Sequence, residues 1–136
     1  MPGKKLARVY IVEDSAAERN MLKDHFSKYP QIKIKEFSNG DSCLKEMIAG
    51  NVEEPDLILM DYFLDSSFGT SRDGLETLTK LKEIFPDTNV IMLTSVENEK
   101  IIDLAKKKGA LDYVVKSAVS FQKLDVILEK HFSLSN

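Results

Sequence analysis

The sequence predicts a doubly wound α/β domain, with a five-stranded parallel sheet and helices on both of its faces. Five short segments rich in Val, Ile, Leu, Phe and Tyr alternate along the chain with five stretches whose apolar residues recur at helical spacing. Short connections between such alternating elements favour right-handed crossovers, and these produce a parallel sheet covered by helices on both sides.

The predicted strands are short and mostly apolar throughout. Three of them contain a continuous apolar run (YIV, LILM and VIML), which is typical of strands buried on both faces of a parallel sheet. The second segment alternates Ile with Lys, so we expect it at an edge of the sheet. The predicted strands cover residues 8–12, 32–37, 56–60, 90–94 and 112–115.

A helix is predicted after each strand, because apolar residues three and four positions apart lie on one face of a helix. Ser15 and Glu18 match a capping box at the start of the first helix. Gly109, directly after three lysines, predicts the end of the fourth helix, since lysines suit the helix dipole and glycine adopts a left-handed cap. The apolar positions are Met21, Leu22 and Phe26; Leu44, Met47 and Ile48; Leu75, Leu78, Leu81 and Phe85; Ile101, Leu104 and Ala105; and Phe121, Leu124 and Leu128.

Length and composition favour one globular domain over residues 1–136, with 43% hydrophobic and 30% charged residues. The net charge of -3 offers no basic face for nucleic acid. Cys43 is the only cysteine, which excludes an internal disulfide and fits a reducing compartment. The first apolar run is too short for a signal peptide or a membrane span, so we expect a cytoplasmic protein without membrane insertion.

Polar side chains follow four of the predicted strands. Glu13 and Asp14 follow the first, Asp61 the third, Thr94 ends the fourth, and Lys116 follows the fifth. In such sheets ligands bind beyond the carboxyl ends of the strands, so these side chains should meet. Each alone suits a surface or turn residue, but together the carboxylates repel one another unless a cation compensates. Oxygen ligands of this kind suit Mg2+.

These residues also supply the parts for phosphoryl transfer. Asp61 is the candidate nucleophile, and Mg2+ would bind and neutralise the negative charge of the phosphoryl group. Thr94 and Lys116 are candidate hydrogen-bond donors to the phosphoryl oxygens. A hydrolase with an aspartyl phosphate intermediate uses similar parts, but its usual Asp-x-Asp motif is absent, because Tyr62 and Phe63 follow Asp61. A flavodoxin-like cofactor binder shares the architecture, but the acids after the first strand would repel a phosphate.

The chain resembles the receiver domains of bacterial response regulators, which have a flavodoxin-like (βα)5 fold. The matching segments are VYIVED at 9–14, LILMD at 57–61, DG at 73–74, LTS at 93–95 and GALDYVVK at 109–116. The resemblance implies that Asp61 is the phosphoacceptor. It also implies that Asp14, Asp61 and the backbone carbonyl of Phe63 help to ligate Mg2+, while Glu13 acts on the metal mainly through water.

The resemblance further implies a switch. Lys116 pairs with a phosphoryl oxygen, the hydroxyl of Thr94 bonds another, and the ring of Tyr113 turns inward when the threonine moves. Such a domain receives its phosphoryl group from a histidine kinase or a histidine phosphotransfer protein and then binds a downstream effector. It is no enzyme, apart from its own phosphorylation and dephosphorylation. A domain with this fold that binds partners without phosphorylation remains an alternative.

Two features depart from the family pattern. Ser117 stands where the family usually has a proline, often in cis, so the loop into the last helix is expected to differ. The segment 64–72 is longer than the usual connection, and we expect it to form a loop beside the site that influences partner choice or access to Asp61.

Overall fold

The structure, a computed structural model, describes residues 3–62 and 73–134. Its main sheet is parallel throughout, in the order β3-β2-β4-β5-β6. The doubly wound fold class is therefore confirmed, with β3 at the edge that the Ile and Lys alternation predicts. The boundaries differ from the predictions by at most one residue: β2 (Arg8–Val12), β3 (Lys33–Phe37), β4 (Leu57–Met60), β5 (Asn89–Thr94) and β6 (Asp112–Val115).

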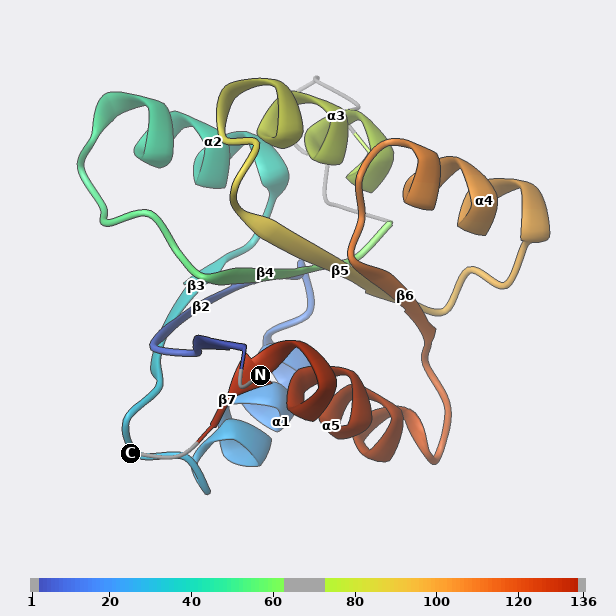
Figure 1. The fold of residues 1–136 in the computed structure, drawn as a ribbon. Coiled ribbons are helices and arrows are strands. Elements are labelled where there is room, and N and C mark those ends of the chain that lie inside the picture. Colours follow the sequence, from blue (N-terminus) through green and yellow to red (C-terminus); the bar gives the residue numbers. More distant parts are fainter. Residues whose placement is uncertain (1–2, 63–72, 135–136) are drawn as a thin grey trace.

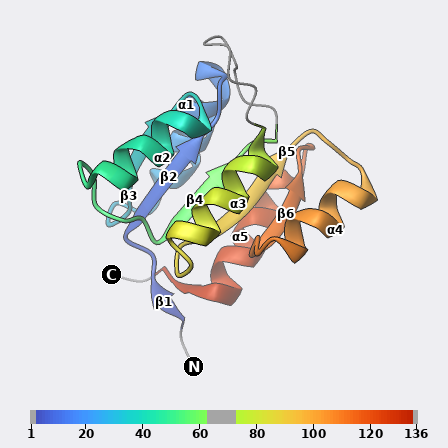
Figure 2. The ribbon, with the colours of Figure 1, turned by 90° about the horizontal axis from the view of Figure 1, so that it is seen from above.

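Within the described residues, five helices cover the sheet, three on one face and two on the other (Figure 1). One face carries α2 (Gly40–Ala49), α3 (Gly74–Ile84) and α4 (Glu99–Lys107). The opposite face carries α1 (Ala16–Phe26) and α5 (Ser120–His131). Figure 2, seen from above, shows these helices running along the sheet on its two sides.

Successive residues of each strand alternate between two hydrophobic cores, because side chains of a strand point to opposite faces of the sheet. Val9 and Ile11 of β2 pack with Phe26 of α1 and with α5. Tyr10 and Val12 of the same strand pack on the other side, with α2 and α3. Both faces are buried, which explains why the central strands are apolar at every position.

The apolar faces of the helices are narrower than the sequence predicts. Met21 is 57% exposed, Ile48 58% and Leu104 42%, although the sequence pattern assigned each of them to the apolar face of its helix. A helix that packs on a sheet buries only the stripe facing the strands, and these three side chains lie at the margin of that stripe. Gly109 follows α4 with φ of 105°, in the left-handed conformation that its position predicts.

The start of α1 contains half of the predicted capping box. The hydroxyl of Ser15 accepts the amide of Glu18 at 3.2 Å, as expected. The amide of Ser15 instead donates to the carboxylate of Glu13 at 3.0 Å, so Glu18 does not make the return contact. Glu13 thereby accepts the bond that Glu18 would accept in a complete capping box, and the side chain of Glu18 binds elsewhere.

A second, two-stranded sheet lies outside the sequence predictions. β1 (Lys4–Lys5) pairs in parallel with β7 (Phe132–Ser133), and both are too short to show a periodicity. Asp56, just before β4, supports the same region. Its carboxylate accepts the amides of Ala7 and Arg8 at 2.9 Å each and pairs with Lys4 at 3.0 Å.

Substituting Asp56 with alanine is expected to lower the free energy of unfolding by about 2 kcal/mol at pH 7, because two amides lose their acceptor. Burial by itself raises the pKa of Asp56, but the bonds from Arg8, Ala7 and Lys4 outweigh it, so the pKa lies below its usual value. The contribution of Asp56 is therefore present at neutral pH and is lost as pH falls below about 4 and through the lowered pKa.

Urea unfolding of the wild type and the Asp56→Ala variant at several pH values tests this expectation. The difference between the two proteins should shrink in acid. Asp87→Ala, at an exposed aspartate, serves as the control. A difference that is independent of pH would mean that the charge of Asp56 contributes nothing to the region around β1.

Candidate functional site

The candidate site lies beyond the carboxyl ends of the strands, at the point where the strand order reverses around β2. Each side chain there is held by a backbone bond that extends the sheet one residue past a strand. The amide of Glu13 donates to Phe37 at 3.0 Å, that of Asp61 to Val12 at 3.1 Å, and that of Lys116 to Thr94 at 2.9 Å. The positions of these functional residues are thus set by the rigid sheet.

The ammonium group of Lys116 is the centre of the cluster. Its Nζ lies 2.7 Å from Oε1 of Glu13, 2.9 Å from Oε2 of Glu18 and 3.0 Å from Oδ2 of Asp61. Glu13 and Asp61 are almost fully buried, with 3% and 7% of their surface exposed, and Lys116 is half-buried. Charge-assisted bonds of this length compensate the burial of the carboxylates.

The two buried carboxyl groups titrate in opposite directions. Burial raises the pKa of Glu13 to about 8, together with hydrogen bonds to Asp14 and Asp61, although Lys116 acts against this change. Burial also raises the pKa of Asp61, but hydrogen bonds with Glu13, Thr94 and Lys116 outweigh it and leave the pKa below its usual value. At neutral pH these opposite shifts favour the neutral form of Glu13 and the ionised form of Asp61.

Lys116 remains charged in this environment. Burial lowers its pKa, but the contacts with Glu13, Glu18 and Asp61 have a larger effect and raise the pKa above the usual value for lysine. A permanently charged ammonium 3.0 Å from the ionised Asp61 can stabilise negative charge that develops on or beside this carboxylate.

Carboxylate oxygens of Glu13, Glu18 and Asp61 all lie within 4.8 Å of one another and could hold a metal ion. Oxygen donors at this spacing fit a hard divalent cation. Of the other predicted metal ligands, Asp14 is exposed and bonds the carboxyl group of Glu13, and its backbone carbonyl accepts Arg19 at 3.1 Å. Phe63 and the predicted 64–72 loop lie outside the described residues.

Glu18 is the residue that the sequence did not assign to the site. Its spacing from Ser15 suggested a capping role, which requires its side chain to turn back to the start of the helix. A usable signal was nevertheless present, because side chains in the first turn of a helix point toward its N-terminus. Here that direction leads from α1 to the acidic strand ends.

Thr94 and Tyr113 are each hydrogen-bonded to Val96, in the segment after β5. Thr94 is fully buried, and its hydroxyl accepts the amide of Val96 at 3.4 Å. The hydroxyl of Tyr113 donates to the carbonyl of Val96 at 2.6 Å, and 9% of the surface of Tyr113 is exposed. Burial raises the pKa of Tyr113 to about 12, and the charges of Asp61 and Tyr62 act in the same direction.

Ser117 leads into α5 through its own hydrogen bonds. Its hydroxyl accepts the amide of Val119 at 3.2 Å, and its carbonyl accepts the hydroxyl of Ser120 at 2.9 Å. Every peptide bond in the described part of the chain is trans. The serine therefore provides a local turn at the position where the family usually has a proline.

The sequence model described as the response regulator receiver domain matches residues 9–129. This chain belongs to that family. The match covers the main sheet except Arg8, the first residue of β2, and all four strand ends that form the candidate site. Receiver domains are phosphorylation-dependent switches of two-component signalling and are generally not enzymes, so neither the hydrolase nor the flavodoxin-like reading is retained.

Relatives of this receiver domain include stand-alone and larger proteins. The chemotaxis protein CheY of Halobacterium salinarum is 32% identical over 120 residues, which cover 88% of this chain and 90% of that protein. The probable C4-dicarboxylate response regulator DctR of Bacillus subtilis is 23% identical over 94% of this chain but only 53% of its own length. The chain therefore spans about half of that relative.

Solved structures agree on the fold. The phosphorylated cyanobacterial phytochrome response regulator RcpA superposes with a TM-score of 0.83, at 23% identity, over 96% of this chain and 97% of that one. The response regulator domain of Thermotoga maritima CheB gives a TM-score of 0.72 at 29% identity, over 93% of each chain. In the described part of this receiver domain, no helix is long and apolar enough to cross a membrane.

Proposed function

We propose that Asp61 accepts the phosphoryl group of this receiver domain, from a histidine kinase or a histidine phosphotransfer protein. The observation that carries the assignment is the contact of Lys116 with Asp61, in which a buried, ionised carboxylate lies 3.0 Å from a charged ammonium at the switch point of the sheet. Glu13 occupies the neighbouring strand end but is the protonated partner, and Glu18 is more exposed. Asp61 is therefore the best nucleophile of the three.

In the proposed transfer, a carboxylate oxygen of Asp61 attacks the phosphorus atom of the phosphohistidine. The P–N bond breaks, the imidazole leaves with the electron pair, and an acyl phosphate forms on Asp61. Lys116 donates to a phosphoryl oxygen, and the hydroxyl of Thr94 donates to another. The ends of β5 and β6 fix the backbone of both residues beside Asp61, so only their side chains must turn toward the phosphoryl group.

Mg2+ is the proposed metal, held by Asp14, Asp61 and the carbonyl of Phe63, with Glu13 acting through water. When bound, it neutralises the carboxylates and the phosphoryl oxygens, as in other phosphoryl transfers. Lys116 is one ammonium group among the carboxyl groups of Glu13, Glu18 and Asp61, whose oxygens lie within 4.8 Å of one another, and this excess of acidic groups favours a further cation beside Asp61.

The proposed output follows from the position of Thr94 between Asp61 and Val96. When the hydroxyl of Thr94 turns to the phosphoryl group, it leaves the amide of Val96, whose carbonyl holds Tyr113. Phosphorylation is thereby linked to α4, β6 and α5, where a downstream effector protein would bind. We infer that residues 1–136 act as one receiver domain in this switch.

Intact-mass measurement tests the proposal directly. The protein is incubated with a small phosphoryl donor and Mg2+, beside a metal-free sample and an Asp61→Asn variant. The expected result is one base-labile phosphoryl group in the wild type only. Uptake by Asp61→Asn would identify another acceptor. No uptake from any donor, phosphorylated histidine proteins included, would leave the phosphorylation-independent binding module as the function.

A further inference from the structure

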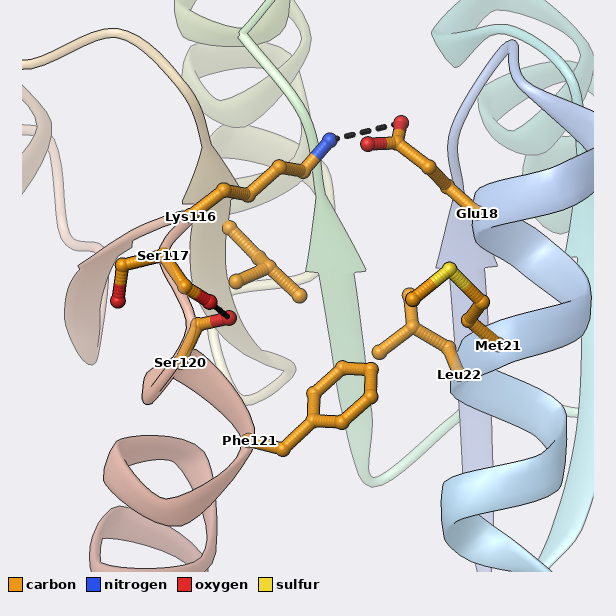
Figure 3. A pocket seen from close by; sticks show the side chains of 8 residues that line it. Glu18, Met21, Leu22, Lys116, Ser117, Ser120 and Phe121 are labelled. Carbon is orange, nitrogen blue, oxygen red and sulfur yellow. Dashed lines mark hydrogen bonds and ion pairs between the residues drawn. The ribbon is translucent and has the colours of Figure 1, made fainter.

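Glu18 reaches the phosphorylation site from outside the set of strand ends. It lies in the first turn of α1, and its carboxylate extends across to Nζ of Lys116 at 2.9 Å. Figure 3 shows this ion pair bridging α1 and the segment after β6. Both side chains line a cavity of about 140 Å3 between α1 and α5, together with Met21, Leu22 and Phe121. The pair therefore lies between the buried cluster and an opening to solvent.

Lys116 has no donor to spare in this arrangement. An ammonium group carries three N–H bonds, and the contacts with Glu13, Glu18 and Asp61 use all of them. Phosphorylation of Asp61 removes the charge of its carboxylate and adds the oxygens of a phosphoryl group. Lys116 must then reorient toward the new oxygens, and every carboxylate that still holds the ammonium opposes this movement.

Glu18 differs from the other two partners in how it is held. Glu13 and Asp61 are fixed by backbone bonds to neighbouring strands, and their side chains are 4% and 9% exposed. The side chain of Glu18 is 40% exposed and lies on a helix.

We propose that Glu18 restrains phosphorylation by competing with the phosphoryl group for Lys116. The proposal rests on Asp61 as phosphoacceptor and adds a residue that sets how readily the site is loaded. In the unphosphorylated protein Glu18 holds the ammonium on the side of α1. In the phosphorylated protein this contact weakens, and α1 loses its charged link to the end of β6.

Glu18→Gln tests the competition, because glutamine keeps the shape of the side chain and removes its charge. Two quantities are measured at saturating Mg2+: the rate of phosphorylation by acetyl phosphate, and the apparent affinity for beryllofluoride, which mimics a phosphoryl group. Both the rate and the affinity are expected to increase by about three- to fivefold, which corresponds to the free energy of one partly exposed ion pair. Glu129→Gln, at an exposed glutamate of α5, should change neither quantity.

A gain in both quantities excludes damage to the structure, which would lower phosphorylation and ligand affinity instead. Unchanged or lower values for Glu18→Gln would overturn the proposal. A calorimetric titration with Mg2+ separates one alternative: weaker metal binding together with slower phosphorylation would assign Glu18 to the metal site. If the wild type itself takes up no phosphoryl group and binds no beryllofluoride, the failure belongs to the proposed function, and the competition fails with it.

Discussion

Replacing Lys116 with methionine is expected to lower the free energy of unfolding by about 3 kcal/mol in metal-free buffer at neutral pH, because a buried ionic cluster loses one partner. The ammonium is the only cation that the described residues place within bonding distance of all three carboxylates, Glu13, Glu18 and Asp61. Without the ammonium of Lys116, the nearly buried carboxyl groups of Glu13 and Asp61 face each other directly, and the ionised carboxylate of Asp61 has no compensating positive charge.

Added Mg2+ is expected to recover much of this loss, since a divalent cation can take over the compensation. Mg2+ should therefore stabilise Lys116→Met more than it stabilises the wild type. Urea unfolding with and without Mg2+ measures both effects, with Lys123→Met, at an exposed lysine of α5, as the matched control. Equal stability of Lys116→Met and the wild type in chelator would show that the cluster does not depend on the ammonium.

Gly74→Ala is expected to disturb the phosphoacceptor through the backbone. A β-carbon at position 74 would lie 2.3 Å from the carbonyl oxygen of Asp61 and 2.8 Å from Cα of Tyr62. Both are main-chain atoms, so the start of α3 or the segment after β4 must move. Overpacking of this kind costs about 2 kcal/mol. A displaced nucleophile should also slow phosphorylation, by about tenfold or more.

Phosphorylation by a small donor and urea unfolding are measured on the same Gly74→Ala preparation. Gly50→Ala is the control. Gly50 has φ of 72°, and a β-carbon at this position would have no neighbouring atom within 4 Å. That substitution is strained by about 1 kcal/mol but lies at the far end of α2. If both variants lose phosphorylation in proportion to their stability, the effect of Gly74→Ala is global and the contact with Asp61 is not responsible.

The sheet could be predicted from the sequence because burial on both faces leaves a continuous apolar pattern in its central strands. The strand ends were predictable for the same reason: Glu13, Asp61 and Lys116 are polar residues that directly follow such runs. Once the topology is known, the geometry of a parallel sheet brings these ends together. The family match over residues 9–129 agrees with this interpretation of the pattern.

The role of Glu18 could not be predicted in this way, because its side chain has two possible partners, the amide of Ser15 and the ammonium of Lys116. Local spacing favours a return bond to Ser15, and only the tertiary structure shows that Glu13 already occupies that amide. Lys116, distant in sequence, then becomes the partner of Glu18. β1 and β7 were missed for a different reason, since two residues carry no periodicity and their pairing depends on contacts between the two ends of the fold.

The pairing of β1 with β7 also bears on how the domain assembles. Lys4 lies opposite Phe132, so this parallel pair closes a loop that contains nearly the whole chain. The entropy lost in closing a loop grows with its length, and only two residues on each strand offset it. The pair can therefore form only after α5 has packed on the main sheet. We therefore expect this pairing to form late in folding and to open before the core around β2 and β4, with early exchange of its amides as the measurable sign.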